Sequence, residues 1–184
     1  MAELGGLGTT AGRGTFAITV DPREFKDLIA ILRTLDEEQS KKMRDNAFPL
    51  SQRLSGQLHQ FAMVAPAPQT RLVAQSIEAK RDRLIRVDIG GKKKVGREYR
   101  SRENKLKSGK GKITKAPAGA LLWGTEYGSF FGVDSRGRKY TRRFVVGRNP
   151  SGYWINPAVD YYAPVVAREY AQILTEVIKE NRLD

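Results

Sequence analysis

The stretch 156–178, NPAVDYYAPVVAREYAQILTEVI, decides the fold class of this chain. Its apolar residues recur at intervals of three or four, the spacing of one face of an α-helix. Asn156-Pro157 is a typical helix start, with Asn as the cap and Pro in the first turn. Pro164 is expected to delay the regular part of this helix to about residue 164. Directly before it, Tyr153-Trp154-Ile155 has the composition of a short strand.

A second long helix is predicted from Glu37 to Val64, where apolar residues again share one broad face. It follows the acidic residues Asp36-Glu37-Glu38, which favour a helix N-terminus. Pro49 should kink this helix or split it in two, and the Pro-rich residues 65–68 should end it. An additional helix is expected to start at Asp21-Pro22.

Shorter elements are expected between and before these helices. Residues 15–20 and 84–89 have strand composition, and 142–146 is a possible strand. Residues 70–77 should form a turn or short helix that leads into a strand, and 118–128 a short helix or turn against the core. We therefore predict an α+β fold in which an antiparallel sheet packs against two long helices. Residues 1–14 are expected to be a flexible arm, and 15–184 a single domain.

Positive charge is concentrated in one part of the chain. Fifteen Lys or Arg and four Asp or Glu lie between Lys80 and Lys115, so this window carries +11 of the net charge of +13. Residues 92–116 contain few apolar side chains and are expected to form a long basic loop or a hairpin arm. Its cations would contact phosphate or an acidic protein surface: Lys92, Lys93, Lys94, Arg97, Arg100, Arg102, Lys105, Lys107, Lys110, Lys112 and Lys115. A solvated loop without a partner is the alternative.

Composition argues against catalysis. The chain has no Cys and one His, which excludes a thiol nucleophile, a Cys-based metal site and any site with two His ligands. His59 lies in an apolar helical run and is expected to be a packed helix residue. No apolar run approaches the ~18 residues of a membrane span, and the N-terminus does not resemble a secretory signal. We expect no enzymatic activity, no metal and no cofactor.

The segment 123–128, WGTEYG, places Glu126 between aromatic residues and glycines. Two interpretations of Glu126 stay open: a turn in which it pairs with an arginine, or a contact with an arginine at a subunit interface. The residues predicted to carry such an interface are Trp123, Glu126, Tyr127, Phe130, Phe131, Arg136, Arg138, Arg142 and Arg143.

Three short segments together resemble one protein family. Residues 65–77 contain Pro, Thr and Leu followed by Ser76-Ile77, 121–128 combine aliphatic residues with Glu126, an aromatic residue and Gly, and 152–158 form an aromatic-Pro-Ala turn. In this order and spacing they resemble the head-to-tail joining (neck, or tail-completion) family of long-tailed double-stranded DNA bacteriophages. The resemblance covers about residues 22–180, although Arg71 replaces a frequent Gly and the basic insertion at 92–115 departs from the pattern.

The resemblance implies a structural virion protein made in the host bacterial cytoplasm. Such proteins form homomeric rings, commonly six- or twelve-fold, between the head connector and the tail tube. The implied partners are other copies of the chain, connector, adaptor or stopper proteins, a tail terminator or tail tube protein, and double-stranded DNA in the lumen, with no membrane. Two alternatives stay open: a tail terminator that caps the tail tube, and a stand-alone basic nucleic-acid-binding protein.

Overall fold

The computed structural model describes residues 7–12, 15–20, 35–100, 113–128, 144 and 146–180. The helix expected after Asp21-Pro22 lies outside these residues. So do many of the predicted contact residues: Phe130, Phe131, Arg136, Arg138, Arg142, Arg143, Arg102, Lys105, Lys107, Lys110 and Lys112. Arg100 is described only as the last residue of a strand.

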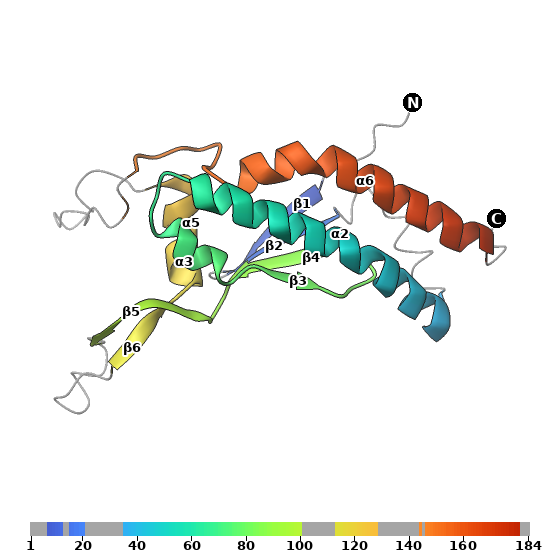
Figure 1. Ribbon diagram of the computed structural model, residues 1–184, viewed down its shortest axis with the longest axis horizontal. Helices are drawn as coiled ribbons and strands as arrows, with labels where there is room; N and C mark the ends of the chain where they lie inside the picture. The colour runs from blue at the N-terminus through green and yellow to red at the C-terminus, as the bar shows by residue number, and fades with distance from the viewer. Residues whose placement is uncertain are drawn as a thin grey trace.

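Two long helices, α2 (Glu37–Val64) and α6 (Ile155–Glu180), lie side by side and run antiparallel (Figure 1). Arg53 forms an ion pair with Glu169, and Phe61 contacts Tyr161, so residues of α2 meet residues of α6 in reverse order. The facing sides of the helices supply most of the core, with Met43, Leu50, Leu54, Leu58, Val166, Tyr170, Leu174 and Val177 buried. This burial at helical spacing gives the two helices most of their stability.

The ends of α2 follow from local sequence. Asp36 caps the first turn, because its carboxylate accepts from Gln39 N at 2.8 Å while the Gln39 side chain accepts from Asp36 N at 3.2 Å. Ala65 is extended, as expected for a residue before proline. Pro49 does not split the helix, which corrects one of the expected outcomes. A proline inside a helix costs about 3 kcal/mol, and the burial of Ala47 and Leu50 on either side of it offsets that cost.

A four-stranded antiparallel sheet with the order β1-β2-β4-β3 packs against the helices (Figure 1). Its strands are β1 (Leu7–Gly12), β2 (Thr15–Val20), β3 (Glu78–Lys80) and β4 (Arg86–Gly90). Val87 and Ile89 alternate with more exposed residues and are buried. Residues 7–12 differ from the expected flexible arm, because their backbone pairs with β2 from Leu7↔Val20 to Gly12↔Thr15. The hydrogen bonds of a strand pair join backbone groups, so a segment with few large apolar side chains can still form a strand.

A separate two-stranded sheet is formed by β5 (Lys94–Arg100) and β6 (Ile113–Pro117), which pair antiparallel. The hairpin alternative is therefore the one that the structure adopts for the ends of the 92–116 segment. Between the pairs Val95↔Ala116 and Tyr99↔Thr114 the register shifts, and Gly96 has a φ of 76°. Such an irregularity bends a ribbon. Val95 is buried at the base of the hairpin, whereas Tyr99 is exposed beyond the irregularity.

Two short helices complete the described fold: α3 (Thr70–Ala74) leads into β3, and α5 (Gly119–Tyr127) lies against the core. The α+β class and antiparallel strand pairing are confirmed. The strand expected at Tyr153-Trp154-Ile155 is wrong, because α6 already begins at Ile155. Asn156 consequently lies inside α6 instead of capping it, and Pro164 does not delay the helix. Phe144 and Val146 are not in a strand, and their neighbours 142, 143 and 145 lie outside the described residues.

Candidate interaction surface

Glu126, near the end of α5, is fully buried and binds the N-terminus of α6. Its carboxylate accepts from Trp154 N at 3.2 Å, Ile155 N at 2.8 Å and Asn156 N at 2.9 Å. These N–H groups have no partner within the helix, and an acceptor at this end also complements the helix dipole. Glu126 therefore caps a helix that begins about thirty residues away. Neither earlier interpretation, pairing with an arginine or an exposed interface contact, fits this position.

The side chain of Glu126 sits in a low-dielectric environment. Burial raises the pKa of Glu126 above its ordinary value, and the backbone N–H groups of residues 153–156 oppose the rise. A raised pKa means that folding favours the neutral form relative to the unfolded chain. The contribution of Glu126 to stability is thus fully present below the pKa of unfolded Glu, and it is lost as the pH rises through the folded pKa.

This predicts a specific pH dependence in a comparison with Glu126→Gln, which cannot ionise. The stability of the wild type relative to the variant should be greater at about pH 4 than at about pH 7. Urea unfolding of both proteins at several pH values in this range measures the difference. Glu176→Gln, which removes an exposed carboxylate from α6, is the control for the substitution itself. A stability advantage of the wild type over Glu126→Gln that increases as the pH rises would contradict the prediction.

Three glycines provide the close packing around Glu126. A Cβ on Gly124 would lie 2.0 Å from the Phe144 ring, and one on Gly128 would lie 1.7 Å from the Gly147 carbonyl oxygen. Gly152 has a φ of 82°, and its Cβ would lie 1.9 Å from Glu126 Oε1. The glycines in 123–128 are therefore required by contacts between α5 and the 144–152 segment.

Hydrogen bonds join the 147–153 segment to the C-terminal end of α5. Asn149 N donates to the Tyr127 carbonyl at 2.9 Å, and Tyr153 N donates to the Glu126 carbonyl at 2.8 Å. The Asn149 side chain also donates to the Gly152 carbonyl at 2.7 Å. This arrangement fixes the orientation of α5 relative to the start of α6.

Trp123 and Tyr127 form a stacked aromatic pair one helical turn apart on α5. Their ring centroids are 5.8 Å apart and the rings are inclined by 14°. Both side chains are half-buried and line a cavity of about 680 Å³ together with Gly124, Gly128, Arg148 and Pro150. The Tyr127 hydroxyl accepts from the Asn156 side chain at 3.3 Å. Aromatic and Arg side chains of this kind are frequent anchors at protein interfaces.

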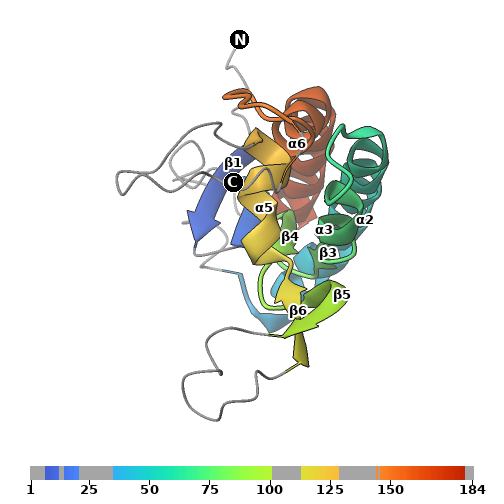
Figure 2. The ribbon, with the colours of Figure 1, turned by 90° about the vertical axis from the view of Figure 1, so that its left-hand side faces the viewer.

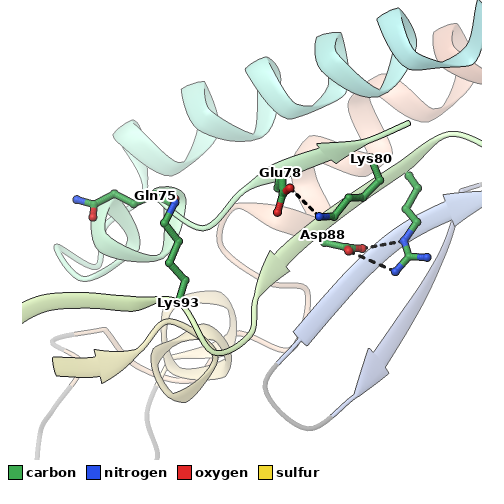
Figure 3. A network of polar contacts seen from close by, with 6 residues as sticks. Gln75, Glu78, Lys80, Asp88 and Lys93 are labelled. Atoms are coloured by element: carbon green, nitrogen blue, oxygen red, sulfur yellow. Dashed lines mark hydrogen bonds and ion pairs between the residues drawn. The ribbon is translucent and has the colours of Figure 1, made fainter. Parts of the chain in front are cut away.

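The hairpin presents the second group of predicted contact residues. Lys92, Lys93, Lys94, Arg97 and Lys115 are all exposed on or beside β5 and β6. Lys93 donates to the Gln75 carbonyl (Figure 3). Among the described residues, none of these five forms an ion pair with a carboxylate. No carboxylate of the described residues therefore neutralises the charge of these five cations.

Two acids of the four-stranded sheet, Glu78 and Asp88, lie near Lys92 and Lys93 at the base of the hairpin, but each already forms an ion pair with a basic residue of its own strand. Glu78 and Asp88 lie opposite each other in β3 and β4, which would repel if both were unpaired. Each has a cationic partner: Lys80 Nζ lies 2.7 Å from a Glu78 carboxylate oxygen (Figure 3), and Arg86 Nε lies 2.9 Å from Asp88. These carboxylates therefore do not neutralise the cations of the hairpin.

Other features of the described residues bear on function. They include no cluster of three or more His, Asp or Glu placed to hold a metal ion. Within the same part of the chain, no helix combines the length and apolar character needed to cross a membrane. His59 is half-buried, with Nδ1 3.1 Å from the Ser55 carbonyl oxygen, as a packed helix residue should be. No family model, curated protein or solved structure matches this chain.

Proposed function

We propose that this chain is a structural subunit of a bacteriophage neck, which assembles into a homomeric ring between the head connector and the tail tube. The resemblance of residues 65–77, 121–128 and 152–158 to the head-to-tail joining family is the origin of the proposal. In this role the chain resides in the virion, contacts connector and tail proteins, and surrounds the DNA channel. It performs no catalysis.

The observation that carries the proposal is the hairpin formed by β5 and β6. A two-stranded hairpin alone is at most marginally stable in water. Of the hairpin residues that the structure describes, Val95 at the base is the one that is buried, and the paired strands extend away from α2 and α6 (Figures 1 and 2). Within the described residues, no third strand pairs with either outer edge. We infer that a neighbouring molecule stabilises this exposed and positively charged element in the assembled ring.

Electron microscopy and sedimentation of the purified full-length chain test the proposal. We expect closed rings of uniform subunit number with a central opening wide enough for a DNA duplex. Binding of the rings to connector or tail tube proteins would support the position in the neck. A chain that stays monomeric across the micromolar range would contradict it.

Reversal of the hairpin charges should impair assembly onto partners. Lys92→Glu, Lys93→Glu, Lys94→Glu and Arg97→Glu together replace four exposed cations, and we expect the yield of joined head-tail particles to fall at least tenfold. The matched control reverses four exposed cations elsewhere: Lys41, Arg71, Arg168 and Lys179. Unchanged yield in the hairpin variant, or an equal loss in the control, would remove the hairpin from the mechanism.

A stand-alone nucleic-acid-binding function is the second candidate, and the exposed cations of the hairpin favour it. A protein of that kind should bind duplex DNA as a monomer or dimer, with an affinity that falls steeply as salt rises. Tyr99 is the one aromatic residue between positions 80 and 115, which argues against stacking on bases. DNA titrations at several salt concentrations, combined with the oligomeric state, separate this function from the ring.

A further inference from the structure

One face of the hairpin is turned toward the body of the protein. Alternate residues of a strand point to opposite sides, and residues paired across an antiparallel ribbon point to the same side. Val95 pairs with Ala116, and Thr114 is two residues from Ala116, so these three side chains share one face. Val95 is buried, and the other two are partly buried. Leu72 of α3 lies 3.1 Å from the position that a Cβ on Gly96 would take, so α3 lies against the base of the hairpin.

The opposite face of the hairpin carries lysine. Lys94 pairs with Pro117, and Lys115 is two residues from Pro117, so both lysines lie on this second face. Both are exposed, as are Lys92 and Arg97 beside them in the chain. We call the surface defined by Lys92, Lys94, Arg97 and Lys115 the basic face. The strand register therefore separates a face that packs near the core from a face that presents cations.

The charge of the hairpin is strongly unbalanced. Its described residues, 92–100 and 113–117, contain six Lys or Arg and a single acid, Glu98, which gives a net charge of +5. Within the part of the chain that the structure describes, no carboxylate forms an ion pair with a cation of the basic face. Like charges held on one narrow ribbon repel one another, and a partner with many negative charges relieves that repulsion.

The composition of the basic face fits a nucleic-acid duplex better than an acidic protein. The buried centres of protein interfaces are poor in Lys and rich in aromatic residues, whereas DNA-binding surfaces are polar and strongly basic. Ile113, two residues from Lys115, is the one large apolar side chain that the described residues place on this side. Tyr99 pairs with Thr114 and therefore points to the opposite side. Proteins that bind single strands stack bases on aromatic rings placed among the cations, and this face has no such ring among the described residues.

We propose that the basic face binds the phosphate backbone of duplex DNA, without reading its base sequence. The inference rests on the proposed ring function, which brings a DNA duplex into the ring, and it names that duplex as the partner of the hairpin. The paired strands extend away from α2 and α6, so the basic face is presented at a distance from the helices (Figures 1 and 2). Two backbone hydrogen bonds, Ala118 N to the Lys93 carbonyl at 2.8 Å and Gly119 N to the Gly91 carbonyl at 3.0 Å, join its base to the start of α5. The cations are therefore held on a ribbon that is anchored to the core.

Binding of the full-length protein to a fluorescently labelled DNA duplex, followed by anisotropy at several salt concentrations, tests the inference. The hairpin variant combines Lys92→Gln, Lys94→Gln, Arg97→Gln and Lys115→Gln, which removes the four cations of the basic face. We expect its affinity for the duplex to fall by about tenfold or more at about 100 mM salt. Each phosphate contact contributes about 0.9 to the slope of log affinity against log salt, so the slope should become shallower by roughly 3 to 4.

A matched control separates local contact from the net charge of the chain. Lys41→Gln, Lys42→Gln, Arg168→Gln and Lys179→Gln together remove four exposed cations of α2 and α6, so the control variant has the same net charge as the hairpin variant. Its affinity should fall by less than about threefold, with little change in the salt slope. An equal loss of affinity in both variants would show that the hairpin has no special role. Circular dichroism verifies that both variants keep the fold.

Tyr99→Ala distinguishes phosphate contact from base stacking. Because Tyr99 points away from the basic face, its removal should change the affinity for the duplex by less than about twofold. Two duplexes of unrelated sequence should likewise bind with affinities that agree within about twofold. A loss in Tyr99→Ala as large as that of the hairpin variant, or a strong sequence preference, would contradict the inference.

The outcomes separate this inference from the proposed function. A hairpin variant that forms rings and binds DNA as the wild type does would show that the DNA contact is wrong while the ring stands. If that variant binds DNA normally but no longer joins heads to tails, the partner of the hairpin is an acidic protein surface and the inference is overturned. A specific loss of DNA affinity in a chain that never forms rings would support the phosphate contact and contradict the ring. Wild-type protein that does not bind the duplex at about 50 mM salt would also overturn the inference.

Discussion

Glu126→Ala should lower the free energy of unfolding by about 4 kcal/mol, because it removes the acceptor for several backbone donors at once. Trp154 N, Ile155 N and Asn156 N all donate to this carboxylate, and Trp154 and Ile155 are fully buried. A buried donor that loses its partner costs about 1–3 kcal/mol, and entry of water into the space left by the side chain recovers part of the total. Chemical denaturation at neutral pH measures the change.

Two further variants define the origin of this effect. Glu126→Gln keeps the volume of the side chain and one carbonyl oxygen. Its free energy of unfolding should therefore lie between those of Glu126→Ala and the wild type. Glu176→Ala removes an exposed carboxylate from α6 and should change stability by less than about 0.5 kcal/mol. If Glu126→Ala were as stable as Glu176→Ala, the capping role of Glu126 would be wrong.

Gly128→Ala is expected to produce the second large loss, about 3 kcal/mol or more, through strain and steric overlap. Gly128 has a φ of 75° and a ψ of −169°, a conformation almost restricted to glycine. A Cβ at position 128 would lie 1.7 Å from the Gly147 carbonyl oxygen. That oxygen belongs to the backbone of the 147–153 segment, which hydrogen bonds hold against α5. The substitution must therefore displace the 147–153 segment or the end of α5.

Gly56→Ala provides a matched control with the opposite sign. Gly56 lies inside α2, and a Cβ there would meet no atom within 4 Å. Alanine in an exposed helix interior should raise stability by about 0.5–1 kcal/mol, because glycine loses more backbone freedom on folding. Thermal or chemical unfolding of both variants tests the pair. Equal effects of the two substitutions would contradict the role assigned to Gly128.

Local patterns predicted the helices and strands well where neighbouring residues decide the structure. Asp36 was expected at a helix start and does cap α2, because its partner Gln39 is three residues away. The stop at 65–68 also follows from local sterics of proline. Predictions failed where a distant group intervened. Asn156-Pro157 resembles a helix start, yet α6 begins earlier because Glu126 binds its first N–H groups.

The candidate site was only partly accessible to the same reasoning. Charge counting identified the basic residues 92–115, but it left a loop and a hairpin equally open, since pairing of β5 with β6 joins residues separated by an intervening segment. The composition of WGTEYG at 123–128 indicates a special role for Glu126, but both roles considered for it, each with an arginine partner, are wrong. Its actual partners are backbone N–H groups about thirty residues away, which no local pattern reveals. The ring contact between Phe61 of α2 and Tyr161 of α6 was not predicted, because each residue has an ordinary helical position and a contact across two helices is not visible in either sequence pattern.

The amino-acid sequence by itself determined the α+β class, the two long helices and the location of excess positive charge. Each of these depends on periodicity or composition over neighbouring residues, which constrain local backbone geometry directly. Only the tertiary structure decided where α6 begins, why residues 124, 128 and 152 are glycine, and which apolar side chains share a surface. These features arise from contacts between segments far apart in the chain, whose geometry is set by packing of the whole core.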